Sequence, residues 1–460
     1  MPREPGFRVD MSSHLFSCRE MEVIWMEYPN IVVITLEHTN YRSLGCYGNQ
    51  EVQTPHIDRF ARDSLLFETC VVPCPLCVPS RVSFFTGRYP SANRSRWNIS
   101  LLPPHGVTLP SILAEAGYRC GLFGKNHCFS NPAASGFCDT MDENVMRQDI
   151  AKQYGNPFPE PPQSFDSSLL EERQRKFRWS EFPRPIWGSG VYPLPKEEAP
   201  SRLNVEKAVD FVHQDSSKPF FLWLSFNDPH PPYRCPEPYN TLYEPESLSL
   251  PPLPLGGVSS YSDVLQFYYR EGCFDLMSES QLRQTMAHYY GMLSYLDDCL
   301  GWFLEEMQRP ELGNTVIVLT ADHGDYMGER GFVRKCAALY DSLVRVPLIV
   351  HGLPGMPKGT SQVLTESIDI MPTLLDIAGL PIPSGVQGFS LMDVMGGRAK
   401  PRDSVYAETG GFYRDFRTES GRPNLEQYTF SLNHSRMVRT SKYKYIYGTN
   451  GHEELYCVED

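Results

Sequence analysis

The stretch NIVVITL, residues 30–36, is an almost continuous apolar run that ends directly at Glu37 and His38. A strand that is apolar on both faces is typical of a parallel sheet covered by helices on both sides. Three later runs repeat the pattern: PFFLWLSF at 219–226, NTVIVLT at 314–320 and VPLIVHG at 346–352. We therefore expect these four runs to be buried parallel strands and neighbours in one sheet.

Helical patterns alternate with these strands. Residues 203–214 form one such pattern, and residues 278–307 form a longer one in which apolar side chains recur at steps of three and four. Ser278 and Gln281 are spaced for a capping box at the start of the longer helix. Strands that alternate with helices predict a doubly wound, mostly parallel α/β fold.

The pattern changes after residue 380. Short alternating runs at 404–408, 436–440 and 442–447 predict a small antiparallel sheet. We expect a main α/β domain that is joined by a linker to a small C-terminal antiparallel α+β subdomain, which is truncated or naturally short. The predicted boundaries are 1–28 for an N-terminal extension, 29–380 for the main domain, 381–402 for the linker and 403–460 for the subdomain.

Composition narrows the classes of function. The 460 residues carry a net charge of −13, which argues against nucleic acid or an anionic membrane as the main partner. No run approaches the ~20 apolar residues that span a bilayer, and the N-terminal stretch lacks the pattern of a signal peptide. The 13 cysteines have no framework spacing and favour reduced thiols. These features predict a cytoplasmic globular protein, and the sequence leaves its oligomeric state open.

Carboxylates and imidazoles follow three of the predicted strands. Because ligands gather at the carboxyl ends of parallel strands, we expect these side chains to meet at one edge of the sheet. Such a set is typical of a site for a hard or borderline divalent ion. Taken singly, each of them could instead cap a helix or bind a loop. The pairs are Glu37 and His38, Asp228 and His230, and Asp322 and His323.

Cys77 lies in the stretch CPLCVPSRVSFFTGR, residues 74–88. A lone cysteine is usually a small buried hydrophobic side chain, and no context typical of a cysteine protease surrounds this one. The run Cys77-Val78-Pro79-Ser80-Arg81, followed by Thr86-Gly87-Arg88, nevertheless resembles the motif of the sulfatase family. In that family a separate maturation enzyme oxidises the cysteine to formylglycine.

The resemblance extends in order from residue 29 to residue 460. It implies an alkaline-phosphatase-like fold, in agreement with the prediction from periodicity. The matching segments are PNIVVITLEHTNYRSLGCYGN (29–49), GLFGKNHC (121–128), DPHPPY (228–233), ADHGDYMGERGFVRK (321–335) and the C-terminal strands RTSKYKYIYGTNGHEELY (439–456).

The resemblance also implies the chemistry and the residues that carry it. The enzyme would hydrolyse sulfate esters of a small molecule or sugar through the hydrated aldehyde of formylglycine. Lys125 and Lys335 would bind the sulfate oxygens, Arg81 would hold the hydrate, His127 would accept a proton and His230 would donate one to the leaving alcohol. The metal, Ca²⁺ with Mg²⁺ or Mn²⁺ as alternatives, would be bound by Glu37, His38, Cys77, Asp322 and His323. A helix that begins near Pro79 would direct its N-terminal N–H groups toward the anion.

One departure from the family pattern bears on the metal. The family usually has two aspartates where this chain has Glu37 and His38. Related phosphonate monoester and phosphodiester hydrolases have Asp-Gln there and Asp-His at the later position, so they are the alternative function. A third hypothesis is that the protein is a non-catalytic relative that binds an anion or a sugar. The chain retains the other polar positions of the family pattern, which argues against this hypothesis.

Residues 141–200 are predicted to form a lid insertion. The segment is rich in proline and aromatic residues and is far longer than an ordinary connection. Basic and aromatic side chains alternate at its centre, a mixture that could stack on a ring and attract an anion. The alternative is a solvated loop or an oligomer contact. The central residues are Arg173, Arg175, Lys176, Phe177, Arg178 and Trp179.

Overall fold

The computed structural model of the chain describes residues 28–458 except 147, 149–187, 215–216, 263–264, 267, 270–271, 354, 356–357 and 411–433. No helix within these ranges combines the length and the apolar character that crossing a membrane requires. Most of the predicted lid, including Arg178 and Trp179, lies outside the described residues. Every cysteine among the described residues is a free thiol.

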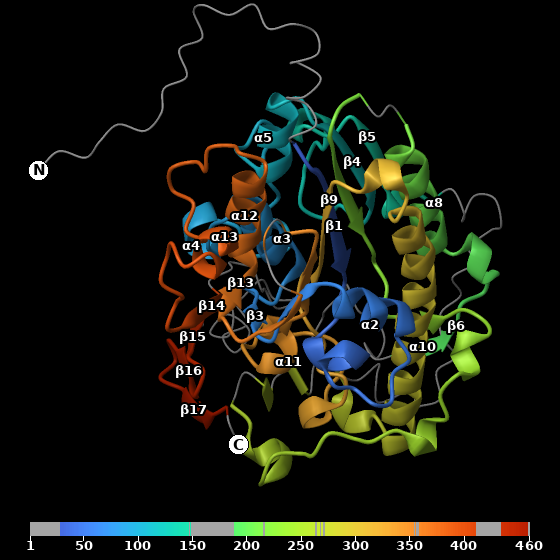
Figure 1. Ribbon diagram of the computed structural model, residues 1–460. Coiled ribbons are helices and arrows are strands. Elements are labelled where there is room, and N and C mark those ends of the chain that lie inside the picture. Colours follow the sequence, from blue (N-terminus) through green and yellow to red (C-terminus); the bar gives the residue numbers. More distant parts are fainter. Residues whose placement is uncertain are drawn as a thin grey trace, which may run out of the picture.

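An eight-stranded sheet forms the centre of the molecule (Figure 1). Its central strand β1 is buried along nearly its whole length, as the apolar run at 30–36 predicts, because β7 and β9 flank it and helices cover both faces. In spatial order the strands are β12 (Gly359–Ser361), β2 (Leu65–Phe67), β11 (Leu348–His351), β9 (Thr315–Ala321), β1 (Asn30–Leu36), β7 (Phe220–Ser225), β4 (Arg119–Gly124) and β5 (Asp139–Asp142).

The sheet is mostly parallel, but the prediction that residues 346–352 form a parallel strand is wrong. β1, β7, β9, β4 and β5 run parallel, whereas β11 pairs antiparallel with β9, with Leu348 opposite Thr320 and His351 opposite Ile317. A parallel neighbour needs a crossover that returns the chain to the starting edge of the sheet. The chain after β9 stays at the carboxyl edge instead and enters β11 from there.

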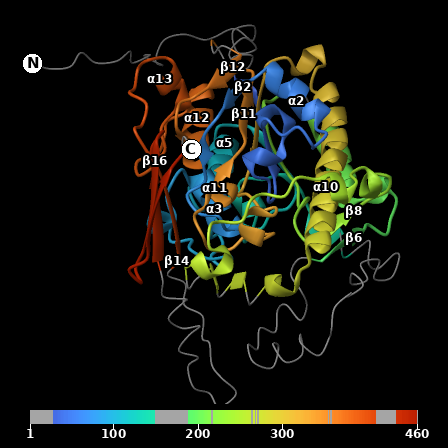
Figure 2. The same cartoon turned by 90° about the horizontal axis from the view of Figure 1, so that it is seen from below.

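Helices cover both faces of the main sheet (Figures 1 and 2). One face carries α2 (Pro55–Arg62), α8 (Pro200–Val212) and α10 (Glu279–Glu306), and the other carries α3 (Cys77–Thr86), α5 (Leu109–Glu115) and α12 (Ile370–Ile377). The predicted capping box of α10 is confirmed, because the Ser278 hydroxyl accepts from the Gln281 N–H and the Gln281 side chain accepts from the Ser278 N–H. The predicted α/β fold class is thus confirmed.

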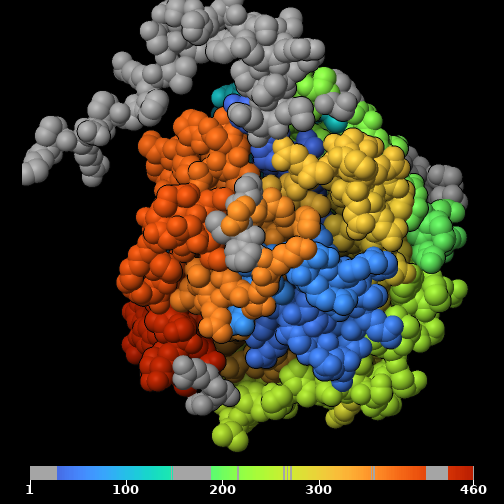
Figure 3. Space-filling model, in the orientation of Figure 1, coloured from blue at the N-terminus to red at the C-terminus, as the bar shows by residue number. Residues whose placement is uncertain are grey.

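A four-stranded antiparallel sheet follows near the C-terminus. Alternate residues of β14 and β16 are buried, the period expected of strands with one face against the protein. The sheet lies on the α3 and α12 side of the molecule, beside the segment that carries α13 (Leu391–Met395) (Figures 2 and 3). Its strands are β14 (Val405–Gly410), β15 (His434–Arg439), β16 (Tyr443–Gly448) and β17 (Glu453–Cys457). The antiparallel subdomain is confirmed, while the domain boundaries given above stay predictions.

Short elements complete the described structure. One small sheet consists of β10 (Arg345–Val346), β3 (Cys70–Val71) and β13 (Thr365–Glu366). Another consists of β6 (Ser189–Val191) and β8 (Tyr233–Cys235). Two further single-turn helices are α4 (Pro90–Asn93) and α11 (Asp341–Val344).

Candidate active site

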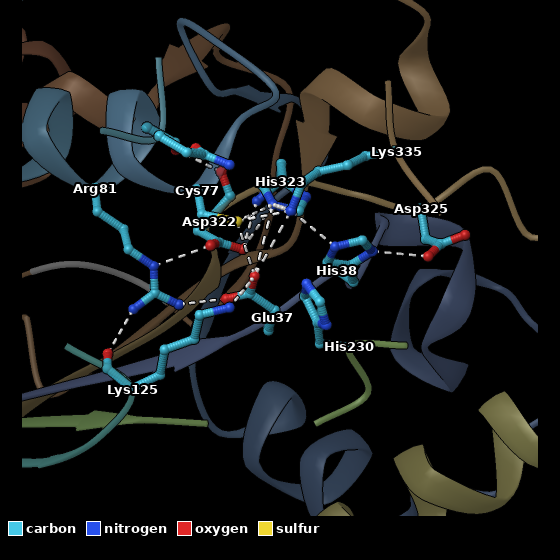
Figure 4. A network of polar contacts seen from close by, with 12 residues as sticks. Glu37, His38, Cys77, Arg81, Lys125, His230, Asp322, His323, Asp325 and Lys335 are labelled. Carbon is cyan, nitrogen blue, oxygen red and sulfur yellow. Dashed lines mark hydrogen bonds and ion pairs between the residues drawn. The ribbon is translucent and has the colours of Figure 1, made fainter. Parts of the chain in front are cut away.

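Polar residues that follow the strands meet at the carboxyl edge of the sheet, as predicted for Glu37, His38, Asp322 and His323. Glu37 and His38 follow β1, Lys125 follows β4, and Asp322 and His323 follow β9. Because these strands are parallel, their ends place the five side chains side by side (Figure 4). All five residues are buried.

Cys77 is the first residue of α3, and every residue of this helix is buried. Pro79 fits the first turn because the N–H that it lacks would have no partner within the helix. The Cys77 Sγ lies 2.6 Å from Lys335 Nζ, 3.1 Å from Glu37 Oε1 and 3.4 Å from His323 Nε2. Cys77, which matches the cysteine that the sulfatase family oxidises to formylglycine, therefore lies inside the polar cluster.

The start of α3 offers fewer N–H groups to an anion than the sequence predicts. The Val78 N–H donates to the Asn98 side chain and the Ser80 N–H donates to the Leu76 carbonyl, at 3.2 and 2.9 Å. Pro79 has no N–H to give. The positive charge of this site therefore comes mainly from side chains.

Arg81 lies one turn after Cys77 on the same face of α3 and is almost fully buried. Its Nη2 donates to Glu37 Oε2 at 2.6 Å and its Nε donates to Asp322 Oδ2 at 3.0 Å. Its Nη1 donates to the Lys125 carbonyl and to the Ser225 hydroxyl, both at 2.7 Å. This single guanidinium joins the ends of β1, β4, β7 and β9.

Two lysines complete the cationic side of the cluster. Lys125 Nζ donates to Glu37 Oε1 at 2.7 Å. Lys335 comes from the loop after β9, and its Nζ lies 2.9 Å from His38 Nε2 and 2.8 Å from His323 Nε2. Three cations, Arg81, Lys125 and Lys335, therefore face two carboxylates, Glu37 and Asp322.

The pKa values of the cluster follow from burial and from these charges. Burial alone would raise the pKa of Glu37, but Lys125, Arg81 and Lys335 outweigh burial and hold it well below its usual value. Burial and the Glu37 charge act to raise the pKa of the Cys77 thiol, yet Lys335, Lys125 and His323 bring it well below its usual value. Burial, together with the charge of Glu37, raises the pKa of Asp322.

Three imidazoles line the same region. Burial and the charge of Lys335 hold the pKa of His38 well below its usual value, and burial, Lys125 and Lys335 do the same to His230. The His230 Nδ1 donates to the Pro231 carbonyl at 2.6 Å, and its ring centroid lies 4.6 Å from that of His38. Burial would lower the pKa of His323, but the Asp322 carboxylate raises it.

His127 is the one predicted site residue that no hydrogen bond, ion pair or ring contact among the described residues joins to this cluster. It follows Lys125 by two positions with a φ of 51°, and its buried Nδ1 has no hydrogen-bond partner among the described residues. Asp228, which follows β7, accepts a hydrogen bond from Ser201 at 2.6 Å and belongs to neither of the metal-binding groups at this edge.

Two overlapping groups in the cluster could hold a metal ion. One consists of Glu37, Cys77, Asp322 and His323, and the other of Glu37, His38 and His230. Within each group the ligand atoms all lie within 4.8 Å of one another. The oxygen and imidazole donors of the first group fit a hard or borderline divalent ion.

Sequence reasoning missed four residues that hold this site together. Ser225 binds Arg81, and Asn98 binds the first turn of α3. Asp325 binds His38 Nδ1 at 2.8 Å and accepts from the Tyr233 hydroxyl at 2.8 Å. Asp325 and Tyr233 lie within the segments that resemble the sulfatase family, but their spacing in the sequence does not indicate that they touch.

Two protein-family models match the chain. The model described as Sulfatase matches residues 29–380, which is more than half of the chain. The model described as N-sulphoglucosamine sulphohydrolase, C-terminal, matches residues 328–459.

Individual proteins agree with the family match. An arylsulfatase of Clostridium perfringens is 28% identical over 403 residues, which are 83% of this chain and 81% of that protein. The human iduronate 2-sulfatase is 27% identical over 411 residues, or 77% of this chain and 70% of that protein. The crystal structure of the phosphonate monoester hydrolase of Agrobacterium radiobacter has the same fold, with a TM-score of 0.73 at 21% identity over 94% of this chain and 89% of that one.

Proposed function

Because the chain belongs to the sulfatase family, we propose that it hydrolyses the sulfate ester of a sugar, using formylglycine made from Cys77 and a divalent metal ion. The observation that carries the proposal is the surplus of positive charge around Cys77. Arg81, Lys125 and Lys335 converge on this point although the whole chain carries a charge of −13. A sulfate group needs such a local surplus, since buried cations stabilise the charge that develops on its oxygens.

The residues at this site fit both formylglycine and a divalent metal ion. The Cys77 Sγ stands where the oxygen of a hydrated formylglycine would lie, and it is within hydrogen-bond distance of Lys335 and Glu37. Formylglycine would supply a nucleophilic hydroxyl at this position. The metal ion would supply Lewis-acid polarisation, and Glu37, His38, Cys77 after conversion, Asp322 and His323 would hold it. We propose Ca²⁺, with Mg²⁺ or Mn²⁺ as alternatives.

The proposed roles of the cations follow from their contacts. Lys335, 2.6 Å from Cys77 Sγ, and Lys125, 2.7 Å from Glu37 Oε1, would bind the sulfate oxygens. Arg81 would hold the hydrate. Its bonds to Glu37 and Asp322 would also hold both carboxylates in place, because the guanidinium nitrogens are bound to different strand ends.

The histidines would move the protons. His230 would protonate the leaving alcohol, and His127 would accept the proton whose removal releases sulfate. The His230 ring has a pKa held well below its usual value by burial and the two lysines. A bound sulfate ester would oppose the charges of those lysines and let the ring carry the proton that it gives away.

A sugar is the proposed alcohol. The human relative is named for its action on iduronate, and the match at residues 328–459 is named for sulphoglucosamine. The second candidate function is hydrolysis of phosphonate monoesters or phosphodiesters. The Asp322–His323 pair favours it, because it resembles the Asp-His pair of those hydrolases; in this chain His323 Nε2 lies 3.4 Å from Cys77 Sγ.

One expression experiment separates these possibilities. The full chain is produced together with a formylglycine-generating enzyme, the peptide that contains Cys77 is weighed by mass spectrometry, and kcat/KM is measured with an aryl sulfate and an aryl phosphonate monoester. We expect conversion of the thiol to the aldehyde and faster hydrolysis of the sulfate. Faster hydrolysis of the phosphonate would establish the second function. Hydrolysis of the aryl sulfate by a protein whose Cys77 remains a thiol would exclude the proposed nucleophile.

A further inference from the structure

The position of His38 is fixed from several sides. The ring is fully buried, and its backbone carbonyl accepts a hydrogen bond from the Tyr289 hydroxyl at 2.8 Å. Its φ is 49°, in the left-handed region that a residue with a Cβ seldom adopts. Such a conformation persists only where surrounding contacts hold it, and it is common at functional sites.

Asp325 is the residue that orients the ring. Its Oδ2 lies 2.8 Å from His38 Nδ1 and also accepts from the Tyr233 hydroxyl, while its Oδ1 accepts from the Met327 N–H at 3.1 Å. Because an ionised carboxylate can only accept hydrogen bonds, it also accepts one from the Nδ1–H of His38. The His38 proton therefore lies on Nδ1, and Nε2 keeps its lone pair.

The Nε2 side of the His38 ring faces into the cluster (Figure 4). Lys335 Nζ lies 2.9 Å from His38 Nε2 and 2.8 Å from His323 Nε2. His323 is oriented in the same way, since its Nδ1 donates to the Gly324 carbonyl at 2.9 Å. Two imidazoles, with ring centroids 4.6 Å apart, thus direct lone pairs toward one positively charged point.

We propose that Asp325, supported by Tyr233, is a positioning residue that makes His38 a metal ligand through Nε2. This inference rests on the proposed function, which includes a divalent metal. A histidine that binds a metal through one nitrogen usually donates the other N–H to a carboxylate or carbonyl, which fixes the tautomer. In this chain Asp325 is that carboxylate.

The test measures metal affinity instead of turnover. The full chain is freed of metal with a chelator and titrated with Mn²⁺ in a calorimeter, because Mn²⁺ accepts both oxygen and imidazole ligands. Asp325→Asn is expected to lower the affinity by about 10–100-fold. The amide can donate to Nδ1 and so move the ring proton to Nε2, where it blocks the lone pair. His38→Ala should lower the affinity as well, and the double variant should bind no more weakly than His38→Ala alone.

Asp369→Asn is the matched control. Asp369 is 1% exposed and accepts from two backbone N–H groups and Arg402, so its loss reports only general destabilisation. It should lower the melting temperature and leave Mn²⁺ affinity unchanged. Unchanged affinity in Asp325→Asn, an equal loss in Asp369→Asn, or a further loss when Asp325→Asn is added to His38→Ala would overturn the positioning role. If the unaltered protein does not bind Mn²⁺ or Ca²⁺, the metal in the proposed function is wrong instead.

Discussion

Two groups of buried charges in this protein are built differently. At the carboxyl edge of the main sheet, Arg81, Lys125 and Lys335 outnumber the carboxylates of Glu37 and Asp322. Where the C-terminal sheet meets the main domain, Asp341 at the start of α11 pairs with Lys444 of β16 at 2.6 Å and with Arg439 of β15 at 3.3 Å. Both groups join segments that are far apart in the sequence.

The two groups of charges differ in how many of their donor and acceptor atoms remain available to bind a ligand. In the contact with the C-terminal sheet, Lys444 and Arg439 point at the same carboxylate. Burial would raise the pKa of Asp341, but the charges of Lys444 and Arg439 lower it to about 2. At the carboxyl edge, the lone pairs of His38 and His323 and the thiol of Cys77 share the Lys335 ammonium. The first arrangement stabilises the fold, and the second leaves donor atoms that could hold a metal ion.

The largest expected effect is the loss of activity when Cys77 is replaced by alanine. Because this residue would carry the nucleophile, kcat/KM for an aryl sulfate should fall by at least about 10⁴-fold. Cys74→Ala is the matched control, since Cys74 is also buried and a free thiol but has no contact with Lys335. Steady-state kinetics and circular dichroism check both variants. Comparable activity losses in the two would contradict a special role for Cys77.

Two equally buried lysines give the next comparison. Lys125→Met should lower kcat/KM by about 10²–10³-fold, because a cation that faces the developing charge is lost. Lys444→Met should leave kcat/KM nearly unchanged but lower the free energy of unfolding by about 3 kcal/mol, because it breaks a buried ion pair. Kinetics and urea unfolding on both variants make the test. A large activity loss in Lys444→Met would mean that the two groups of charges are coupled.

The smallest effect concerns the pH dependence of stability. The pKa of Asp341 is about 2 in the folded protein, below its ordinary 3.8, so its ionised form contributes about 2 kcal/mol at neutral pH. This contribution is complete above about pH 5 and is lost as the pH falls toward 2. Asp341→Asn should therefore be less stable at pH 7, by a margin that narrows in acid.

Urea unfolding between pH 3 and pH 7 measures this margin. Asp403→Asn is the control, because Asp403 pairs with Lys400 where both side chains are exposed. It should change the free energy of unfolding by less than about 0.5 kcal/mol at any of these pH values. A margin for Asp341→Asn that does not change with pH would show that the ion pairs of Asp341 do not stabilise the junction.

Local patterns in the sequence indicate the main helices and strands, and the resemblance to a family motif indicates much of the site. Apolar runs at 30–36 and 314–320 mark strands buried on both faces, and the spacing of apolar residues with Ser278 and Gln281 marks α10 and its start. These patterns are local, since burial and capping depend on neighbouring residues. The resemblance of residues 77–81 to a family motif then indicated where the chemistry lies.

Contacts between distant residues, in contrast, follow from the three-dimensional fold. β11 turned out antiparallel because its direction depends on the path of the loop that follows β9. Asp325 meets His38 across 287 positions, and Lys444 meets Asp341 across 103. No periodicity of the chain encodes such pairs, because they arise when the sheet brings strand ends and loops together. The orientation of a ligand ring is therefore a property of the folded protein, while the residue that supplies the ring is a property of the sequence.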